Sequence, residues 1–276
     1  MTTTVLTRYL YNLDDVRHSL FIEILRKNYK EALHWCYELY WSGYKEETFE
    51  FLINNLYNEI FDKNEEFEER IKNEYEEWKK DNNKHENIGN ITINLCFRNY
   101  EISRLINEYF KLNCKEKNDK KPEETKLYIN LKIKDIEDHT TKYGESGTRY
   151  KVLKEVCKYK LSSQYNKVFQ GEVKKKNHKE LLINNWEYYA YKSPYWKEAF
   201  EEYGGKVKQG RIVFDNENLL EEFYNKYDLE IDEQSQEVQD IVFGINNEKQ
   251  KTISQFTKEF NGVIKTTKLK KKVNID

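Results

Sequence analysis

The chain has 276 residues and a net charge of −2, with 35% charged and 15% aromatic residues. A nearly neutral chain has no overall field that would draw it to nucleic acid or to an anionic membrane, so only local patches could do so. The length suffices for one large domain or two small ones with a buried core. With only 2 prolines and many Glu, Lys and Leu residues, the composition favours helices.

The four cysteines, Cys36, Cys96, Cys114 and Cys157, stand far apart in the sequence and form no CxxC pair. Disulfide frameworks are typical of small secreted domains, and the first residues do not show the pattern of a signal peptide. No apolar run approaches the roughly 18 residues that a membrane-spanning helix needs. We therefore expect reduced thiols in a soluble intracellular protein that is not secreted and does not enter a membrane.

The first part of the chain shows the apolar spacing of packed helices, beginning with an apolar lead-in over residues 1–13. Residues 28–44 are apolar around most of a helical wheel, which predicts a buried helix that begins at Asn28 and ends at Gly43. The segments on either side carry one apolar stripe each, so we expect them to pack against this central helix. The predicted helices are residues 14–27, 28–44, 46–61, 65–80 and 101–112, with a polar loop over residues 80–90.

The chain changes character at residues 113–125, a charged stretch with Pro122 that predicts an exposed linker. Beyond it, apolar residues alternate with polar ones over 127–133, which predicts a strand, and residues 206–214 predict a hairpin that turns at Gln209 and Gly210. Ser193 and Pro194 predict the start of a helix. The other helices predicted here are residues 150–159, 216–227 and 233–243.

These elements predict a mainly α protein. An N-terminal antiparallel helical stack, solenoid-like and spanning residues 1–112, is followed by the linker and by a smaller C-terminal α+β part over residues 126–243. No motif recurs at a fixed period, so the likeness to a solenoid is structural only. Residues 244–276 form a polar, lysine-rich tail that we expect to be poorly ordered.

Two groups of sequence blocks resemble an uncharacterised family of proteins encoded by giant DNA viruses. The first runs from LTRYLYNLDDVRHSL to ALHWCYELYWSGY, and the second comprises NWEYYAYKSPYW, YGG, IVFDNENLLEEFY and DEQSQEVQD. The blocks share the family's order and span residues 6–243. The family has no known activity, so the resemblance implies no catalytic residues. It implies a viral protein that acts in the host cytoplasm, for instance in the virus factory.

A dense aromatic block over residues 186–196 is the predicted partner-binding surface. Trp and Tyr combine a large apolar area with a polar tip, which makes them common anchors of protein interfaces. The residues that we assign to this surface are Trp186, Tyr188, Tyr189, Pro194, Tyr195 and Trp196. Packing in the interior is the alternative, and it is the more common role of such side chains.

The histidines and acidic residues do not predict a catalytic or metal site. The five histidines form neither an HxxxH nor an HExxH pair. His34 and Cys36 do not face each other on the predicted central helix, which argues against a Cys–His nucleophile. The acidic run 135–138, followed by His139, could bind a cation, but a solvated helix start is the commoner role. We predict no catalytic residues, no metal and no cofactor.

Two lysine clusters are the candidates for contact with nucleic acid, because phosphate contacts require only cations on an accessible segment. The cluster residues are Lys174, Lys175, Lys176, Lys268, Lys270, Lys271 and Lys272. No zinc-finger or RNA-recognition motif accompanies them. A solvated surface is the alternative for both clusters.

From these observations we expect a non-enzymatic protein of a giant virus that binds a viral or host protein or serves as a scaffold. Aromatic-rich helices without a catalytic constellation support this expectation. A nucleic-acid-associated factor in viral transcription or translation is the first alternative, because of the lysine clusters. An enzyme of unrecognised type is the second. The sequence predicts neither the identity of the partner nor the oligomeric state.

Overall fold

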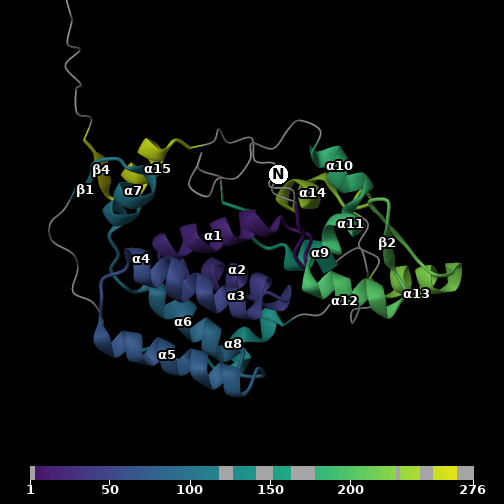
Figure 1. Cartoon of the computed structure of the whole chain (residues 1–276), viewed down its shortest axis with the longest axis horizontal. Coiled ribbons are helices and arrows are strands. Elements are labelled where there is room, and N and C mark those ends of the chain that lie inside the picture. The colour runs from purple at the N-terminus through teal and green to yellow at the C-terminus, as the bar shows by residue number, and fades with distance from the viewer. Residues whose placement is uncertain are drawn as a thin grey trace, which may run out of the picture.

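The structure is a computed structural model, and it describes residues 4–117, 127–140, 152–162, 178–227, 231–242 and 251–265. Figure 1 shows a stack of helices from the N-terminal part beside a group of shorter helices and a hairpin from the C-terminal part. The described residues are mainly helical with two small antiparallel sheets, which confirms the predicted fold class. No helix among them is long and apolar enough to cross a membrane.

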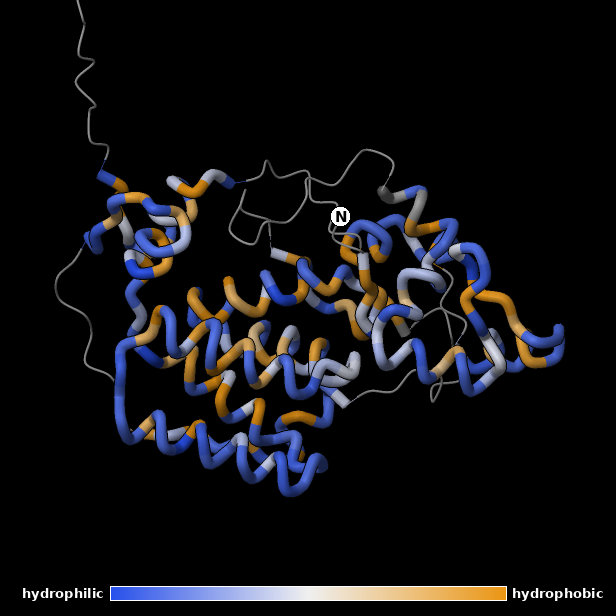
Figure 2. The backbone as a smooth tube through the Cα atoms, in the orientation of Figure 1, coloured by the Kyte–Doolittle hydropathy of each residue, from blue (hydrophilic) through white to orange (hydrophobic). Residues whose placement is uncertain are grey.

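The helical stack is built around α2 (Tyr29–Trp41), whose residues from Ala32 to Tyr40 are all buried. The helix α1 (Leu13–Leu25) packs along it, as predicted. The other elements of the stack are α3 (Lys45–Glu50), the π-helical segment η1 (Phe51–Tyr57), α4 (Asn58–Ile60), α5 (Glu65–Lys80) and α6 (Glu86–Cys96). In Figure 2 the hydrophobic residues gather between these layers, while α5 along the edge is mostly hydrophilic.

The second large contact of α2 is with α6, and α3, in the range of the helix predicted over residues 46–61, also packs against α2 as expected. The prediction of a loop over residues 80–90 is therefore wrong from Glu86 onward. Every residue of α6 from Asn87 to Cys96 is buried. The sequence ENIGNITINLC appears loop-like because of its asparagines, but buried amides are compatible with a helix when their hydrogen bonds are satisfied.

Residues 4–12 form a buried looped segment and not a further helical turn, despite their helical spacing. Thr7 N–H donates to Tyr11 O at 2.8 Å, and Leu10 takes a positive φ of 64° between them. Asn12 then caps α1 by accepting from the N–H groups of Asp14 and Asp15. The apolar residues of this segment therefore anchor a loop in the core.

The strand predicted over residues 127–133 is also wrong. Residues 127–132 run in an extended conformation and pair with no strand among the described residues. The helix α8 (Ile133–Ile136) follows, with a 3₁₀ turn, η2 (Glu137–His139). The alternating pattern correctly indicates an extended chain. Its hydrogen-bond partners are side chains of α6, as described below.

The ranges predicted as a linker and as a poorly ordered tail contain paired elements. The strand β1 (Cys114–Glu116), which follows α7 (Ile102–Phe110), pairs with β4 (Gly262–Ile264), and α15 (Ile253–Glu259) precedes β4. Phe256 of α15 is fully buried and stacks on Phe21 of α1 at 6.2 Å between ring centroids. The C-terminal segment 251–265 is thus part of the core, because its few apolar residues pack against α1.

Local signals in the C-terminal part are confirmed. Ser193 Oγ accepts from Trp196 N–H at the start of α12, with Pro194 as its first residue. The predicted hairpin turns at Gln209 and Gly210, both with positive φ, and Asn216 Oδ1 accepts from Leu219 N–H at the next helix start. The elements here are α9 (Val152–Val156), α10 (His178–Asn184), α11 (Trp186–Ala190), α12 (Pro194–Glu202), β2 (Lys206–Lys208), β3 (Arg211–Val213), α13 (Glu217–Tyr227) and α14 (Gln236–Val242).

A buried ion pair joins the looped N-terminal segment to the centre of the stack. Arg8 Nε lies 3.0 Å from Glu38 Oε2 on α2, and both side chains are almost inaccessible to water. Glu38 Oε1 accepts from Tyr9 N–H at 2.9 Å, while Arg8 Nη2 donates to His139 O at 2.8 Å. Burial raises the pKa of the Glu38 carboxyl, and Arg8 opposes that rise.

We expect Glu38→Gln to lower the free energy of unfolding by about 3–5 kcal/mol, because it leaves the buried Arg8 charge without its counter-ion. Glu66→Gln is the matched control. Glu66 pairs with Arg70 at 3.5 Å on the exposed face of α5, where such a pair contributes about 0–1 kcal/mol. Urea denaturation of both variants measures the difference. Equal losses would contradict the central role of the Arg8–Glu38 pair.

Candidate functional site

The predicted partner-binding block is largely interior. Trp186 and Trp196 are only 3% and 0% exposed, which corrects the prediction that these rings are available to a partner. Trp196 Nε1 donates to Thr7 O at 3.0 Å, and its ring contacts Tyr227 edge-on at 5.5 Å. The indole therefore ties α12 to the N-terminal segment and fills the space between them.

The rest of the block lies nearer the surface. Pro194 is exposed, and Tyr188, Tyr189 and Tyr195 are half-buried. Lys192 Nζ stands over the rings of Tyr188 and Tyr189, at 4.3 and 4.7 Å from their centroids. A role of Tyr188, Tyr189, Pro194 and Tyr195 in partner binding stays a prediction. The lysine clusters at 174–176 and 268–272 lie outside the described residues.

We expect Trp196→Ala to destabilise the protein by about 3–5 kcal/mol, because a fully buried indole leaves a large cavity behind. Lys197→Ala, at an exposed position one residue further along α12, is the control and should change stability by less than about 0.5 kcal/mol. Thermal melts followed by circular dichroism distinguish the two roles of the block. A Trp196→Ala protein that melts like the wild type would restore the interface interpretation.

A row of asparagines on α6 holds the extended segment 127–131, a short stretch of main chain that lies along the helix. Asn94 Nδ2 donates to Ile129 O at 2.7 Å, and Ile129 N–H donates back to Asn94 Oδ1 at 2.9 Å. One turn earlier on α6, Asn90 Oδ1 accepts from Leu131 N–H at 2.7 Å. We call Asn87, Asn90 and Asn94 the asparagine row.

The spacing of side chains on one face of α6 matches the spacing of alternate residues in the extended segment 127–131. Residues four apart on a helix lie on one face and are about 6 Å apart along its axis. Alternate residues of an extended chain are about 6.6 Å apart. Asn90 and Asn94 can therefore hydrogen-bond to the main chain of two alternate residues of the extended segment. Their side chains supply the hydrogen bonds that a neighbouring strand would supply in a sheet.

Glu74 of α5 orients the asparagine row. Its carboxylate accepts from Asn87 Nδ2 at 2.7 Å and from Asn90 Nδ2 at 3.1 Å. Because an ionised carboxylate only accepts hydrogen bonds, this contact turns Asn90 Oδ1 toward the extended segment. Burial raises the pKa of Glu74, and the amides of the row oppose that rise. Asn87 Oδ1 is buried without a hydrogen-bond partner among the described residues.

The side chains of the extended segment pack on either side of the row. Tyr128 lies against Phe67 of α5, with Arg70 over its ring at 5.2 Å. A Cβ at Gly89 would meet the Tyr37 hydroxyl and would lie 2.7 Å from Leu131 Cδ1, so the glycine lets both side chains approach α6 closely. Beside the segment, a polar hollow of about 470 Å³ is lined by Glu74, Asn87 and Tyr128, among others.

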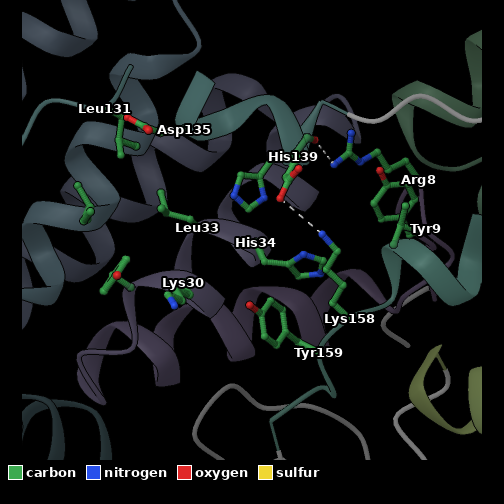
Figure 3. A pocket seen from close by; sticks show the side chains of 14 residues that line it. Arg8, Tyr9, Lys30, Leu33, His34, Leu131, Asp135, His139, Lys158 and Tyr159 are labelled. Atoms are coloured by element: carbon green, nitrogen blue, oxygen red, sulfur yellow. Dashed lines mark hydrogen bonds and ion pairs between the residues drawn. The ribbon is translucent and has the colours of Figure 1, made fainter. Parts of the chain in front are cut away.

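A second candidate site is a cavity of about 520 Å³ between α2, the η2 turn and the segment after α9. His34 of α2 and His139 of η2 contribute their rings, 6.4 Å apart between centroids. Figure 3 shows both rings beside Lys158, whose ammonium lies 3.8 Å from Asp138. We call this space the His34 cavity.

Both imidazoles of the His34 cavity are neutral near pH 7. Burial, together with the neighbouring His139, Arg8 and Lys158, lowers the pKa of His34 to about 3. Burial also lowers the pKa of His139 to about 4; Arg8 and Lys158 act in the same direction and Asp138 opposes them. His139 stacks on Tyr37 at 5.1 Å, while His34 Nε2 is buried without a hydrogen-bond partner in the described part of the chain.

We expect the ring signals of His34 and His139 to stay constant from pH 8 to pH 5 in NMR spectra of the folded protein. In the unfolded chain both groups titrate near pH 6.5, so the unfolded state binds more protons below that pH. Acidification from about pH 6.5 should therefore lower the free energy of unfolding, by up to about 1.4 kcal/mol per pH unit for each histidine.

Glu74 acts in the opposite direction. Its pKa is raised by folding, so its protonation favours the folded state as the pH falls. The variant His139→Gln isolates the histidine contribution, because it should show a shallower loss of stability between pH 6.5 and 5. An inflection near pH 6.5 in the folded wild type would contradict the burial of these rings.

The sequence predicts neither arrangement. One signal for the asparagine row was present, since Asn87, Asn90 and Asn94 follow the spacing of one helical face. The His34 cavity gives no such signal, because His34 and His139 come from distant parts of the chain. Among the described residues, no three His, Cys, Asp or Glu side chains gather as metal ligands.

Comparisons with models of protein families, with curated proteins and with solved structures give no match to this chain. The class that the structure itself defines is a mainly helical protein with a small C-terminal sheet part. Its candidate binding sites are the asparagine row and the His34 cavity.

Proposed function

We propose that this chain is a non-enzymatic protein-binding protein, and that the asparagine row on α6 is its binding site for an extended peptide segment of a partner. The observation that carries the proposal is the two-way hydrogen bonding between Asn94 and the main chain of Ile129. Main-chain contacts of this kind give affinity without demanding a particular sequence, as in other modes of extended-peptide recognition.

The chain's own segment 127–131 occupies the row in the structure. We therefore take its hydrogen bonds as the model for how a partner peptide would bind. Its side chains supply specificity, because Tyr128 packs on α5 and Leu131 packs over Gly89. The hollow beside Asn87, whose Oδ1 has no hydrogen-bond partner among the described residues, offers space where a longer partner could continue.

The setting of this activity rests on the sequence resemblance alone. The resemblance to giant-virus proteins suggests a partner of viral or host origin in the cytoplasm of an infected cell. A nucleic-acid-associated role and an enzymatic role remain alternatives, and no contact in the described residues favours the first of them.

The test uses a fluorescent peptide with the sequence of residues 126–133, KLYINLKI. In the wild type the row is occupied, so we expect little binding. In Ile129→Pro the N–H that Asn94 accepts is absent, which should loosen the internal segment and allow saturable binding of the peptide. Adding Asn94→Leu should then weaken binding about tenfold or more, because two hydrogen bonds to the peptide are lost.

Asn54→Leu, at an exposed position of η1, is the matched control in the Ile129→Pro protein. A peptide with proline at the position of Ile129 is the matched control ligand. Circular dichroism checks that each variant is folded, and Leu131→Pro replaces Ile129→Pro if the latter is not. A folded, loosened variant that does not bind KLYINLKI, or binds it equally well without Asn94, would reject the proposal.

A further inference from the structure

The His34 cavity contains a buried polar atom that nothing in the described protein satisfies. His34 is only 7% exposed and lines the cavity, and its buried Nε2 has no hydrogen-bond partner among the described residues. Buried polar groups in folded proteins almost always have a partner, whether protein, water or ligand. An unpaired ring nitrogen at a cavity of this kind therefore indicates a place where a polar group of another molecule binds.

The charges around the cavity favour a negative group at this place. Arg8, Lys30 and Lys158 contribute cations to the lining. Two of these cations have carboxylate partners, since Glu38 binds Arg8 and Asp138 lies 3.8 Å from Lys158. Asp135 accepts from Lys132 N–H at 2.8 Å, and Lys30 has no ion pair among the described residues. The lining itself carries three cations and two carboxylates, and a lining with an excess of positive charge attracts an anion more than a cation.

The remaining walls suit an apolar body. Leu33, Ile93 and Val156 are buried residues of the lining, and the ring of Tyr159 contacts His34 edge-on at 5.1 Å. A volume of about 520 Å³ falls within the range of about 300–1,000 Å³ that is usual for small-molecule sites. Such sites combine mostly apolar walls with a few polar groups that fix the orientation of the ligand.

The geometry points to the His34 cavity as a binding site for a small organic anion, a carboxylate or phosphate on an apolar or aromatic body. The oxyanion binds between Lys158 Nζ and a proton on His34 Nε2, and the body lies against Leu33, Ile93 and Val156. Lys30 stands at the exposed edge of the cavity, where it attracts the anion from solvent. The observations behind this inference do not depend on peptide binding to the asparagine row.

The test follows the imidazole nitrogens of His34 by NMR in the full-length, isotope-labelled protein. Phenyl phosphate and benzoate are the probes, benzyl alcohol is the neutral analogue, and inorganic phosphate is the anion without a body. We expect a saturable shift of His34 Nε2 with at least one of the two probes and none with benzyl alcohol. Inorganic phosphate should bind at least about tenfold more weakly, because it leaves the apolar walls uncovered.

Two variants locate the anion. Lys158→Met should weaken probe binding about tenfold, since it removes the cation proposed to contact the oxyanion. Lys160→Met, an exposed neighbour outside the lining, is the matched control and should bind like the wild type. Should Lys158→Met fail to fold, the wild-type shifts still decide. The proposal is overturned if neither probe shifts His34 Nε2, if the neutral analogue shifts it equally, or if both lysine variants bind alike.

Discussion

The buried pair of Arg8 and Glu38 is the constraint on which the arrangement of the chain depends. A charge removed from water must be compensated by its partner and by hydrogen bonds, so the elements that supply these groups are fixed in place. Glu38 belongs to α2 and Arg8 to the N-terminal segment, so the ion pair connects these two elements. The hydrogen bond from Arg8 to His139 O connects the η2 turn to them. The same guanidinium lines the His34 cavity and helps to keep its imidazoles neutral.

The helix α6 shows how a segment rich in polar residues can be buried in the interior of the protein. Its asparagines can be buried because their amides are hydrogen-bonded. Asn90 binds Glu74 and the N–H of Leu131, and Asn94 binds the main chain of Ile129 and donates to Asn90 O on its own helix. Each amide oriented in this way excludes other arrangements, since an unsatisfied buried amide is costly. The row is therefore both a structural clamp and a surface adapted to main chain.

The parts of the fold that sequence predicts are those with local causes. The Ser193–Pro194 helix start and the turn at Gln209 and Gly210 depend on neighbouring residues only, so their patterns are sufficient. The burial of Trp196, the pairing of β1 with β4 and the seating of residues 127–131 depend on partners far along the chain. Composition also misleads at α6, because asparagine favours turns unless distant groups satisfy its amide. The candidate sites consist of such distant partners, which is why the sequence did not reveal them.

The asparagine row and the His34 cavity share one piece of chain. Leu131 donates its N–H to Asn90 and lines the cavity with its side chain, and Asp135, Asp138 and His139 follow it along the same wall. Under the two proposals, a ligand that contacts this wall would stabilise the seated segment, and a partner peptide that displaces the segment would remove the wall. Coupling between two binding equilibria is reciprocal, so each ligand would weaken the binding of the other by the same factor. The segment 127–139 is thus the element through which a small anion would control access to the row.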